Sequence, residues 1–167
     1  MDNSGLPVLA CEPMFKVLVI FWCVTIATVA SELPTKRYLN LAAIKKMVSA
    51  AEAKAQELHV QVTLCIVDES GNLLFLQKAD NVALNTIQWA QRKARHAAFY
   101  KAPSREAAET VKKGSVEALA YPDFFPNQGG LPILVGGEIL GGIAASGARS
   151  EIDEAVAQAG LDALNKP

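Results

Sequence analysis

The sequence predicts an α+β domain in which helices pack on an antiparallel sheet. Two segments, residues 60–77 and 132–146, place apolar residues on either side of glycine-containing turns, which is typical of β-hairpins. Segments with helical periodicity surround them and give the element order α-β-β-α-α-β-β-α. Because hairpins join neighbouring strands without a crossover, this order favours an antiparallel sheet.

The composition is that of a globular domain. The chain has 167 residues, of which 51% are hydrophobic and 20% charged, so it can bury a core and is not a disordered tail. Its formal net charge of −1 provides no basic surface for phosphates, and no nucleic-acid-binding motif occurs. The sequence therefore predicts one domain that does not bind nucleic acid.

Residues 1–30 are expected to be a secretory signal segment. Lys16 precedes residues 17–30, VLVIFWCVTIATVA, which carry no charge and end on small residues. As a helix this stretch would span about 21 Å, against ~30 Å for the hydrocarbon core of a bilayer, which argues against the alternative of a transmembrane helix. Met14 is an alternative start that would give a short basic leader. We expect the folded domain to comprise residues 31–167 and to be secreted or periplasmic, without a stable membrane span after cleavage.

Cysteine usage predicts no disulfide framework in that domain. Cys11 and Cys23 would leave with the signal segment, so Cys65 alone would remain. A single cysteine in a strand is usually a small buried hydrophobic residue, and the alternative is a reactive thiol or ligand.

The first helix and first hairpin are predicted from periodicity. Asn40 is a favourable N-cap, and the residues after it place one apolar stripe on a helix: Leu41, Ile44, Met47, Val48, Ala51, Ala55 and Leu58. The next segment alternates, with Val60, Val62, Leu64 and Ile66 on one face and Gln61, Thr63 and Cys65 on the other. The turn DESGN, with Gly71 at a positive φ, leads into the second strand, LLFLQ.

A second helix is expected over residues 85–100 and ends before Pro103. Its stripe of small residues would allow close packing on a neighbour: Ile87, Ala90, Ala94, Ala97 and Ala98. Ser104 is predicted to cap a short third helix that ends near Lys112, and residues 121–130, YPDFFPNQGG, are expected to form a loop.

The second hairpin carries an unusual face. Strand 139–146 is predicted to place Ile139, Gly141, Ile143 and Ala145 on one side, and Leu140, Gly142, Ala144 and Ser146 on the other. A strand glycine costs roughly 0.5–1 kcal/mol relative to alanine, so the second face predicts a close neighbour: the alanine-striped helix, a second subunit or a ligand.

The last helix is expected to begin at Ser150, with Asp153 as its capping-box partner. Its predicted inward positions are Ile152, Val156, Ala159 and Ala163.

Residues 128–164, QGGLPILVGGEILGGIAASGARSEIDEAVAQAGLDAL, resemble the C-terminal signature of the haem-degrading-domain family, which includes GlcG-like and HbpS-like proteins. Residues 91–104, QRKARHAAFYKAPS, resemble the family's K-A-x-[TH]-A-x-x-F helix and its Pro-[ST] stop, with Phe99 one place early and Tyr100 at the aromatic position. The similarity spans about residues 39–165. It implies a three-layer fold with an antiparallel sheet of about five strands, assembled as a homo-oligomer. Several relatives are secreted and bind haem, and others have no agreed activity.

The resemblance makes His96 the candidate haem-iron ligand, because it matches a family position often filled by Thr and implicated in haem contact. Imidazole is a common haem ligand. The alternative is a histidine that faces solvent or packs against a helix. If His96 binds iron, then Lys93, Arg92 and Arg95 on the same helix could pair with the haem propionates, although such residues commonly face water.

Aromatic residues could cover the faces of a porphyrin. The candidates are Tyr100, Tyr121, Phe124 and Phe125, for which packing in a core or an interface is the alternative.

Other candidate ligands have simpler explanations. His59 follows the first helix, where a histidine commonly interacts with free carbonyls. The acidic residues Glu151, Asp153 and Glu154 would favour the N-terminus of the last helix, with iron binding as the alternative. The chain has no CxxCH, HExxH or GxSxG motif, so any haem would be bound non-covalently.

Three functions remain open from the sequence. The first is an exported, oligomeric haem-binding protein that sequesters or senses haem. The second is an enzyme acting on a small organic acid or degrading haem, with the glycine-lined surface as its pocket. The third is a structural oligomer in which that surface joins subunits. No acid–base pair or activated nucleophile is evident, so an enzyme is the less favoured hypothesis.

Overall fold

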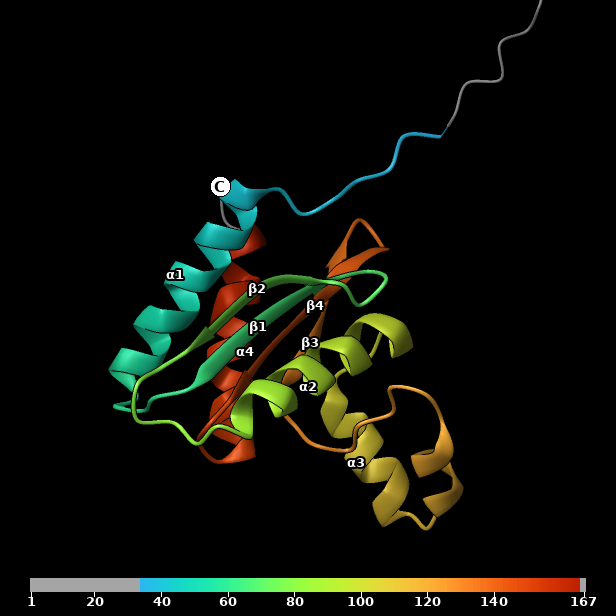
Figure 1. Cartoon of the computed structure of the whole chain (residues 1–167). Coiled ribbons are helices and arrows are strands. Elements are labelled where there is room, and N and C mark those ends of the chain that lie inside the picture. The colour runs from blue at the N-terminus through green and yellow to red at the C-terminus, as the bar shows by residue number, and fades with distance from the viewer. Residues whose placement is uncertain (1–33, 166–167) are drawn as a thin grey trace, which may run out of the picture. The chain divides into compact units, whose positions relative to one another are not determined.

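A computed structural model describes residues 34–165, and residues 35–165 of these lie in one compact unit. The predicted signal segment lies outside the described residues. The elements are α1 (Leu41–Glu57), β1 (Thr63–Asp68), β2 (Leu73–Lys78), α2 (Thr86–Tyr100), α3 (Ser104–Lys112), the 3-10 helix η1 (Val116–Ala120), β3 (Gly130–Val135), β4 (Glu138–Ser146) and α4 (Ser150–Asn165) (Figure 1). Within this part of the chain, no helix is long and apolar enough to cross a bilayer.

The sheet is antiparallel throughout, in the order β2-β1-β4-β3, which confirms the α+β prediction. Over the described residues it has four strands, not the approximately five that the family resemblance implied. The chain between α3 and β3 instead forms η1 and an irregular loop. Pro122 and Pro126 in that loop lack the N–H that a strand ladder requires.

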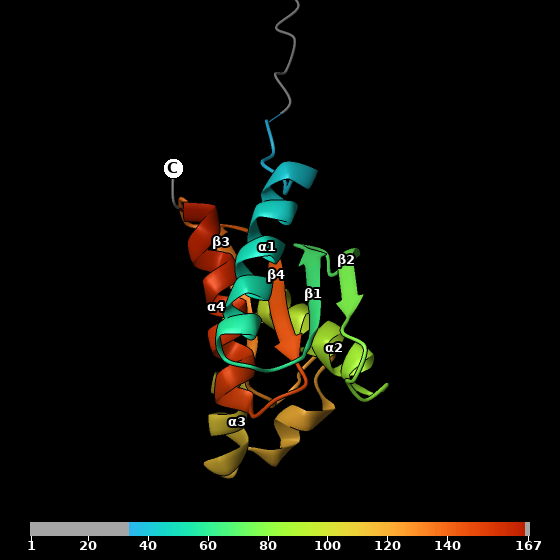
Figure 2. The same ribbon diagram turned by 90° about the vertical axis from the view of Figure 1, so that its left-hand side faces the viewer.

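Helices cover both faces of the sheet and produce three layers. Figures 1 and 2 show α1 and α4 side by side on one face, and α2 across the other. The main core lies between the sheet and α1 with α4, and includes Met47, Ile66, Ile133, Ile143 and Val156. The helical and strand periodicities predicted this core, because their apolar stripes face each other across it.

The second core, between the sheet and α2, is built from small residues. Ala90, Ala94 and Ala98 of α2 pack against Cys65, Val67 and Ala144. A Cβ on Gly142 would lie 2.1 Å from the carbonyl oxygen of Ala94, so only glycine allows this helix to approach so closely. The close neighbour of the glycine face is therefore the alanine-striped helix, and that face is not free to join subunits.

A β-bulge changes the predicted faces of β4. The register shifts between Ile133 and Leu134, so that Leu134 pairs with Ile139 and Ile133 with Gly141. The unpaired residue, Leu140, turns into the main core with Ile143 and Ala145, while Ile139 stays partly exposed. The prediction that Ile139 shares a face with Ile143 is wrong because strict alternation ignores the bulge.

Capping was predicted correctly at one helix and wrongly at two. The Asn40 side chain accepts a hydrogen bond from Ala43 N at 2.8 Å. Ser104 does not cap α3, since its hydroxyl donates to the carbonyl of Asn127 and accepts from Gly130 N. Asp153 directs its carboxylate to Ala148 N and to Lys93 instead of forming the predicted capping box.

The inward face of α4 is also offset from the prediction. Its buried residues are Asp153, Val156, Ala157 and Gly160, whereas Ile152, Ala159 and Ala163 are only partly buried. Packing against both α1 and the sheet selects this face.

Candidate functional site

His96 lies in the C-terminal half of α2, covered by aromatic rings. Its ring stacks on Tyr100, with centroids 4.6 Å apart, and meets the edge of Phe124 at 5.3 Å. The Phe124 ring also contacts Tyr100 and Tyr121 edge to face. We call His96, Tyr100, Tyr121 and Phe124 the aromatic cluster. The structure thus brings together the histidine and three of the aromatic residues that the sequence singled out.

The hydrogen bonding of His96 determines which ring nitrogen carries a proton. The backbone N–H of Phe125 donates to Nδ1 at 3.2 Å, so the neutral ring holds its hydrogen on Nε2. His96 is 2% exposed, and this burial lowers its pKa, although a backbone hydrogen bond to Asp123 and the charge of Glu106 oppose the shift. His96 is therefore neutral at pH 7, the form that can bind a metal.

Hydrogen bonds from Arg95 and Tyr100 help to hold the loop of residues 121–127 over His96. The guanidinium of Arg95 binds both carboxylate oxygens of Asp123, at 2.7 and 3.1 Å, and also donates to the carbonyl of Gly71. The Tyr100 hydroxyl donates to the carbonyl of Pro122 at 2.8 Å. Opening the loop would break these bonds, which lie near the surface and are weak individually.

Arginine residues flank the same side of α2. The guanidinium of Arg92 lies over the ring of Phe125, 4.2 Å from its centroid, and that of Arg95 lies 5.1 Å from the centroid of Phe99. Arg92 is exposed, so it is available to an anionic group at the surface. Arg95 is largely engaged by Asp123.

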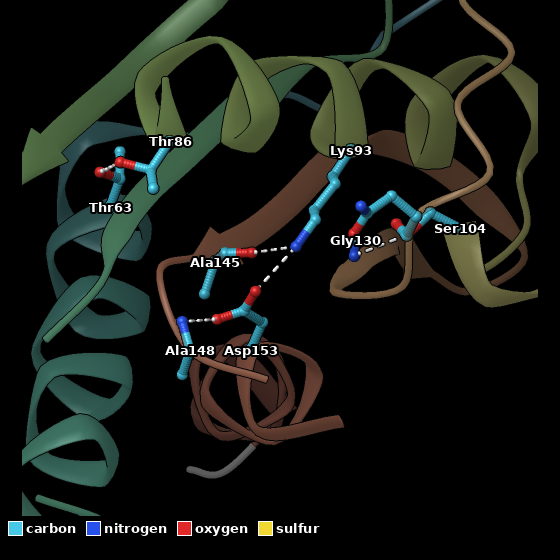
Figure 3. A network of polar contacts seen from close by, with 9 residues as sticks. Thr63, Thr86, Lys93, Ser104, Gly130, Ala145, Ala148 and Asp153 are labelled. Carbon is cyan, nitrogen blue, oxygen red and sulfur yellow. Dashed lines mark hydrogen bonds and ion pairs between the residues drawn. The ribbon is translucent and has the colours of Figure 1, made fainter. Parts of the chain in front are cut away.

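Lys93 lies elsewhere and has a different role from the predicted one. It is 1% exposed, and its Nζ lies 2.8 Å from Oδ2 of Asp153 and 3.1 Å from the carbonyl oxygen of Ala145 (Figure 3). The Asp153 carboxylate also accepts from Ala148 N at 2.9 Å. Burial lowers the pKa of Lys93, and the charge and hydrogen bond of Asp153 partly offset that effect. Lys93 is therefore not placed to pair with a propionate at the surface.

This buried ion pair was not predicted, although the sequence contained a signal for it. The spacing of Ala90, Lys93, Ala94 and Ala97 places the lysine on the same helical face as the alanine residues. Asp153 shares the buried face of α4 with Val156 and Ala157 in the same way. A charge on each of two apolar stripes indicates a buried pair, because an unpaired buried charge is too costly.

The remaining candidates do not gather into a metal site. His59 is exposed and has a positive φ of 53°, and Cys65 is buried in the second core. Among residues 34–165, no group of three or more His, Cys, Asp or Glu residues is positioned to hold a metal ion.

Comparison with known proteins places the chain in a family. Residues 39–162 match the family described as haem degrading protein HbpS-like. A 15.0 kDa protein from the dhaT-dhaS intergenic region of Citrobacter freundii is 33% identical over 135 residues, covering 77% of this chain and 93% of that protein. Protein GlcG of Escherichia coli K12 is 29% identical over 112 residues, covering 67% of this chain and 84% of GlcG.

Two solved structures share this fold, and each is more than 25% identical to this chain in sequence. The crystal structure of HbpS has a TM-score of 0.72 and 30% identity, covering 78% of this chain and 93% of HbpS. The crystal structure of a PduOC–haem complex has a TM-score of 0.72 and 26% identity, covering 77% of this chain and 96% of PduOC. The chain belongs to the HbpS-like family of haem-degrading proteins.

Proposed function

We propose that this chain binds haem non-covalently, with His96 as the residue that would hold the iron, and that it sequesters or senses haem. The observation that carries the proposal is the aromatic cluster around a neutral histidine, with Arg92 at the adjacent surface. Membership of a family that includes HbpS, and the fold shared with the haem-bound PduOC, support the same ligand. When bound, haem would supply a redox-active iron, and this chain would supply an imidazole ligand, apolar cover and a cation for a propionate.

Binding requires the loop of residues 121–127 to open. His96 is too buried for contact with a porphyrin in the described conformation, and Nδ1 is occupied by the N–H of Phe125. If Nε2 bound iron, the ring hydrogen would move to Nδ1, where it would face that N–H as a second donor. Either ring nitrogen can therefore serve as ligand only after Phe125 N moves away.

The Arg95–Asp123 pair controls this opening in the proposed mechanism. If only a small fraction of the protein is in the conformation that can bind, the apparent affinity is the intrinsic affinity multiplied by that fraction. Loosening the loop should raise the competent fraction and the apparent affinity. The proposal thus predicts opposite effects for a ligand variant and a loop variant.

A haem titration of the full chain tests the proposal. The Soret band should shift saturably at one haem per chain in the unaltered protein and lose that response in His96→Gln, whose far-UV circular dichroism should remain native. The exposed His59→Gln is the matched control and should bind as the unaltered chain does. Asp123→Ala should bind haem faster in stopped-flow mixing. Equal titration curves for His96→Gln and the unaltered chain would refute His96 as the ligand.

We further propose that the protein is exported and forms a homo-oligomer. The uncharged residues 17–30 support export. Leu73 on the edge strand β2 and Leu134 on the edge strand β3 are exposed, and exposed apolar edges favour association. Amino-terminal sequencing of the mature protein, and light scattering after size-exclusion chromatography, test these two statements separately. A retained Met1 or Met14 would refute cleavage, and a monomeric mass would refute assembly.

A further inference from the structure

A small pocket opens where the glycine face of β4 emerges from under α2. Gly142 and Ala144 on that face are covered by α2, whereas Ser146, the next residue on the same face, lines the pocket. The rest of the wall comes from Asn85 and the N-terminal half of α2 as far as Lys93, from Asn127, and from the turn before α4 with its first residues. Its volume is about 180 Å³. The pocket lies at the N-terminal half of α2, away from the aromatic cluster.

Two hydrogen-bond donors with capacity for a further partner face this pocket, the Ser146 hydroxyl and the Lys93 ammonium. Ser146 is 2% exposed as a residue, and its hydroxyl opens into the pocket without a hydrogen bond to another described residue. The ammonium of Lys93 has three hydrogens, of which Ala145 O and Asp153 Oδ2 accept two. Because this hydroxyl opens into the pocket and is not sealed in the core, a ligand in the pocket can accept a hydrogen bond from it and another from the partly satisfied ammonium.

The acidic residues at the start of α4 are each balanced by a cation. Glu151 pairs with Arg149 at 3.3 Å, Asp153 pairs with Lys93, and Glu154 pairs with Arg105. The first turn of α2 contains no acidic residue. The side-chain charges around the pocket therefore cancel, which leaves the partial positive charge of two helix N-termini. This field favours an anion over a cation.

We propose that this pocket binds a small carboxylate, which accepts hydrogen bonds from the Ser146 hydroxyl and from Lys93. At ~30 Å³ per water molecule, the volume is equivalent to about six waters, which suits an acid of two to four carbons and excludes a porphyrin. Hydrogen bonds to a charged partner are the stronger kind, and both donors are fixed by burial. The inference does not rest on haem binding, because it uses none of the aromatic cluster.

Trp89 provides the measurement, because it lines the pocket and its side chain is 42% exposed. The chain has two tryptophans, and the other, Trp22, is replaced by Phe in the full chain so that Trp89 alone reports. Lactate is titrated at constant ionic strength, with lactamide as the uncharged analogue. Ser146→Ala removes the unpaired hydroxyl without leaving a partner unsatisfied. Ser115→Ala, on a partly buried loop serine outside the pocket, is the matched control.

Lactate should change the Trp89 emission saturably, and Ser146→Ala should weaken binding by about tenfold, the usual effect of one hydrogen bond to a charged group. Ser115→Ala should leave the affinity unchanged, and lactamide should bind much more weakly than lactate. No saturable response to lactate, equal affinity in Ser146→Ala, or equal binding of lactamide would each overturn the inference. Haem titration of Ser146→Ala should be normal, so the two proposals fail independently.

Discussion

Replacing Asp153 with Asn should destabilise the fold in a way that depends on pH. The substitution retains a side-chain oxygen for the hydrogen bond from Ala148 N but removes the charge that balances Lys93. The side chains of Lys93 and Asp153 are 1% and 3% exposed, so water cannot replace the lost partner. Breaking a buried pair typically costs about 3–5 kcal/mol, which is a large part of the roughly 5–15 kcal/mol that stabilises a domain.

The sign of the pH dependence follows from the pKa of Lys93. Burial lowers that pKa below the ordinary value of 10.5, and without Asp153 its largest opposing influence is gone. Between the folded and unfolded pKa values the unfolded chain binds more protons, so stability rises with pH by up to about 1.4 kcal/mol per unit. The contribution is fully present above 10.5 and is lost as the pH falls through the folded pKa. The deficit of Asp153→Asn should therefore shrink between pH 7 and pH 10.

Urea unfolding, followed by far-UV circular dichroism at several pH values, measures the free energy of unfolding of the variant and of the unaltered chain. The deficit is the difference between the two values, and the contributions of groups that titrate alike in both proteins cancel in it. Asp162→Asn, an exposed carboxylate on the same helix, is the control and should change stability by less than about 0.5 kcal/mol. A deficit that stays constant from pH 7 to pH 10, or no deficit at pH 7, would refute the assignment of Lys93 and Asp153 as a charged buried pair.

Two further predictions concern the packing between α2 and the sheet. Gly142→Ala should lower the free energy of unfolding by about 1–3 kcal/mol, because the new Cβ would lie 2.1 Å from the Ala94 carbonyl oxygen. Urea unfolding measures this loss, and an unchanged stability would contradict the close approach of α2 to β4. Cys65 is fully buried, which raises its pKa to about 12, so in a chain with Cys11 and Cys23 replaced by Ser it should react with a thiol reagent only after unfolding. Rapid labelling of that folded chain would contradict the packing described for β1 and α2.

Local patterns predicted most of the fold because they depend on neighbouring residues. The alanine stripe of α2, the positive φ of Gly71 and the Asn40 cap are all set by short segments. The features that were missed depend on partners far along the chain. Ser104 looks like a cap but serves Asn127 and Gly130, and the bulge at Leu140 is fixed only when β3 pairs with β4.

In the candidate site, too, the features set by nearby residues were predicted, and those that depend on distant partners were missed. The resemblance pointed to His96, and two of the aromatic residues considered as cover for a porphyrin, Tyr100 and Phe124, lie against its ring. It could not indicate that Phe125 N occupies Nδ1, because that bond depends on how the loop folds back over α2. Lys93 was grouped with the neighbouring arginines, although its helical face sets it apart. Its partner, Asp153, is 60 residues away, and only the assembled core brings them together.

Resonance Raman spectroscopy of the haem-loaded chain tests the proposed ligand most directly. Reduced, five-coordinate haem bound by an imidazole gives an iron–histidine vibration that shifts when the histidines carry nitrogen-15. We expect this isotope-sensitive band in the unaltered chain and in His59→Gln, and its loss in His96→Gln. If His96→Gln retains the band, haem is not held by His96 and the proposed opening of the loop over it is contradicted.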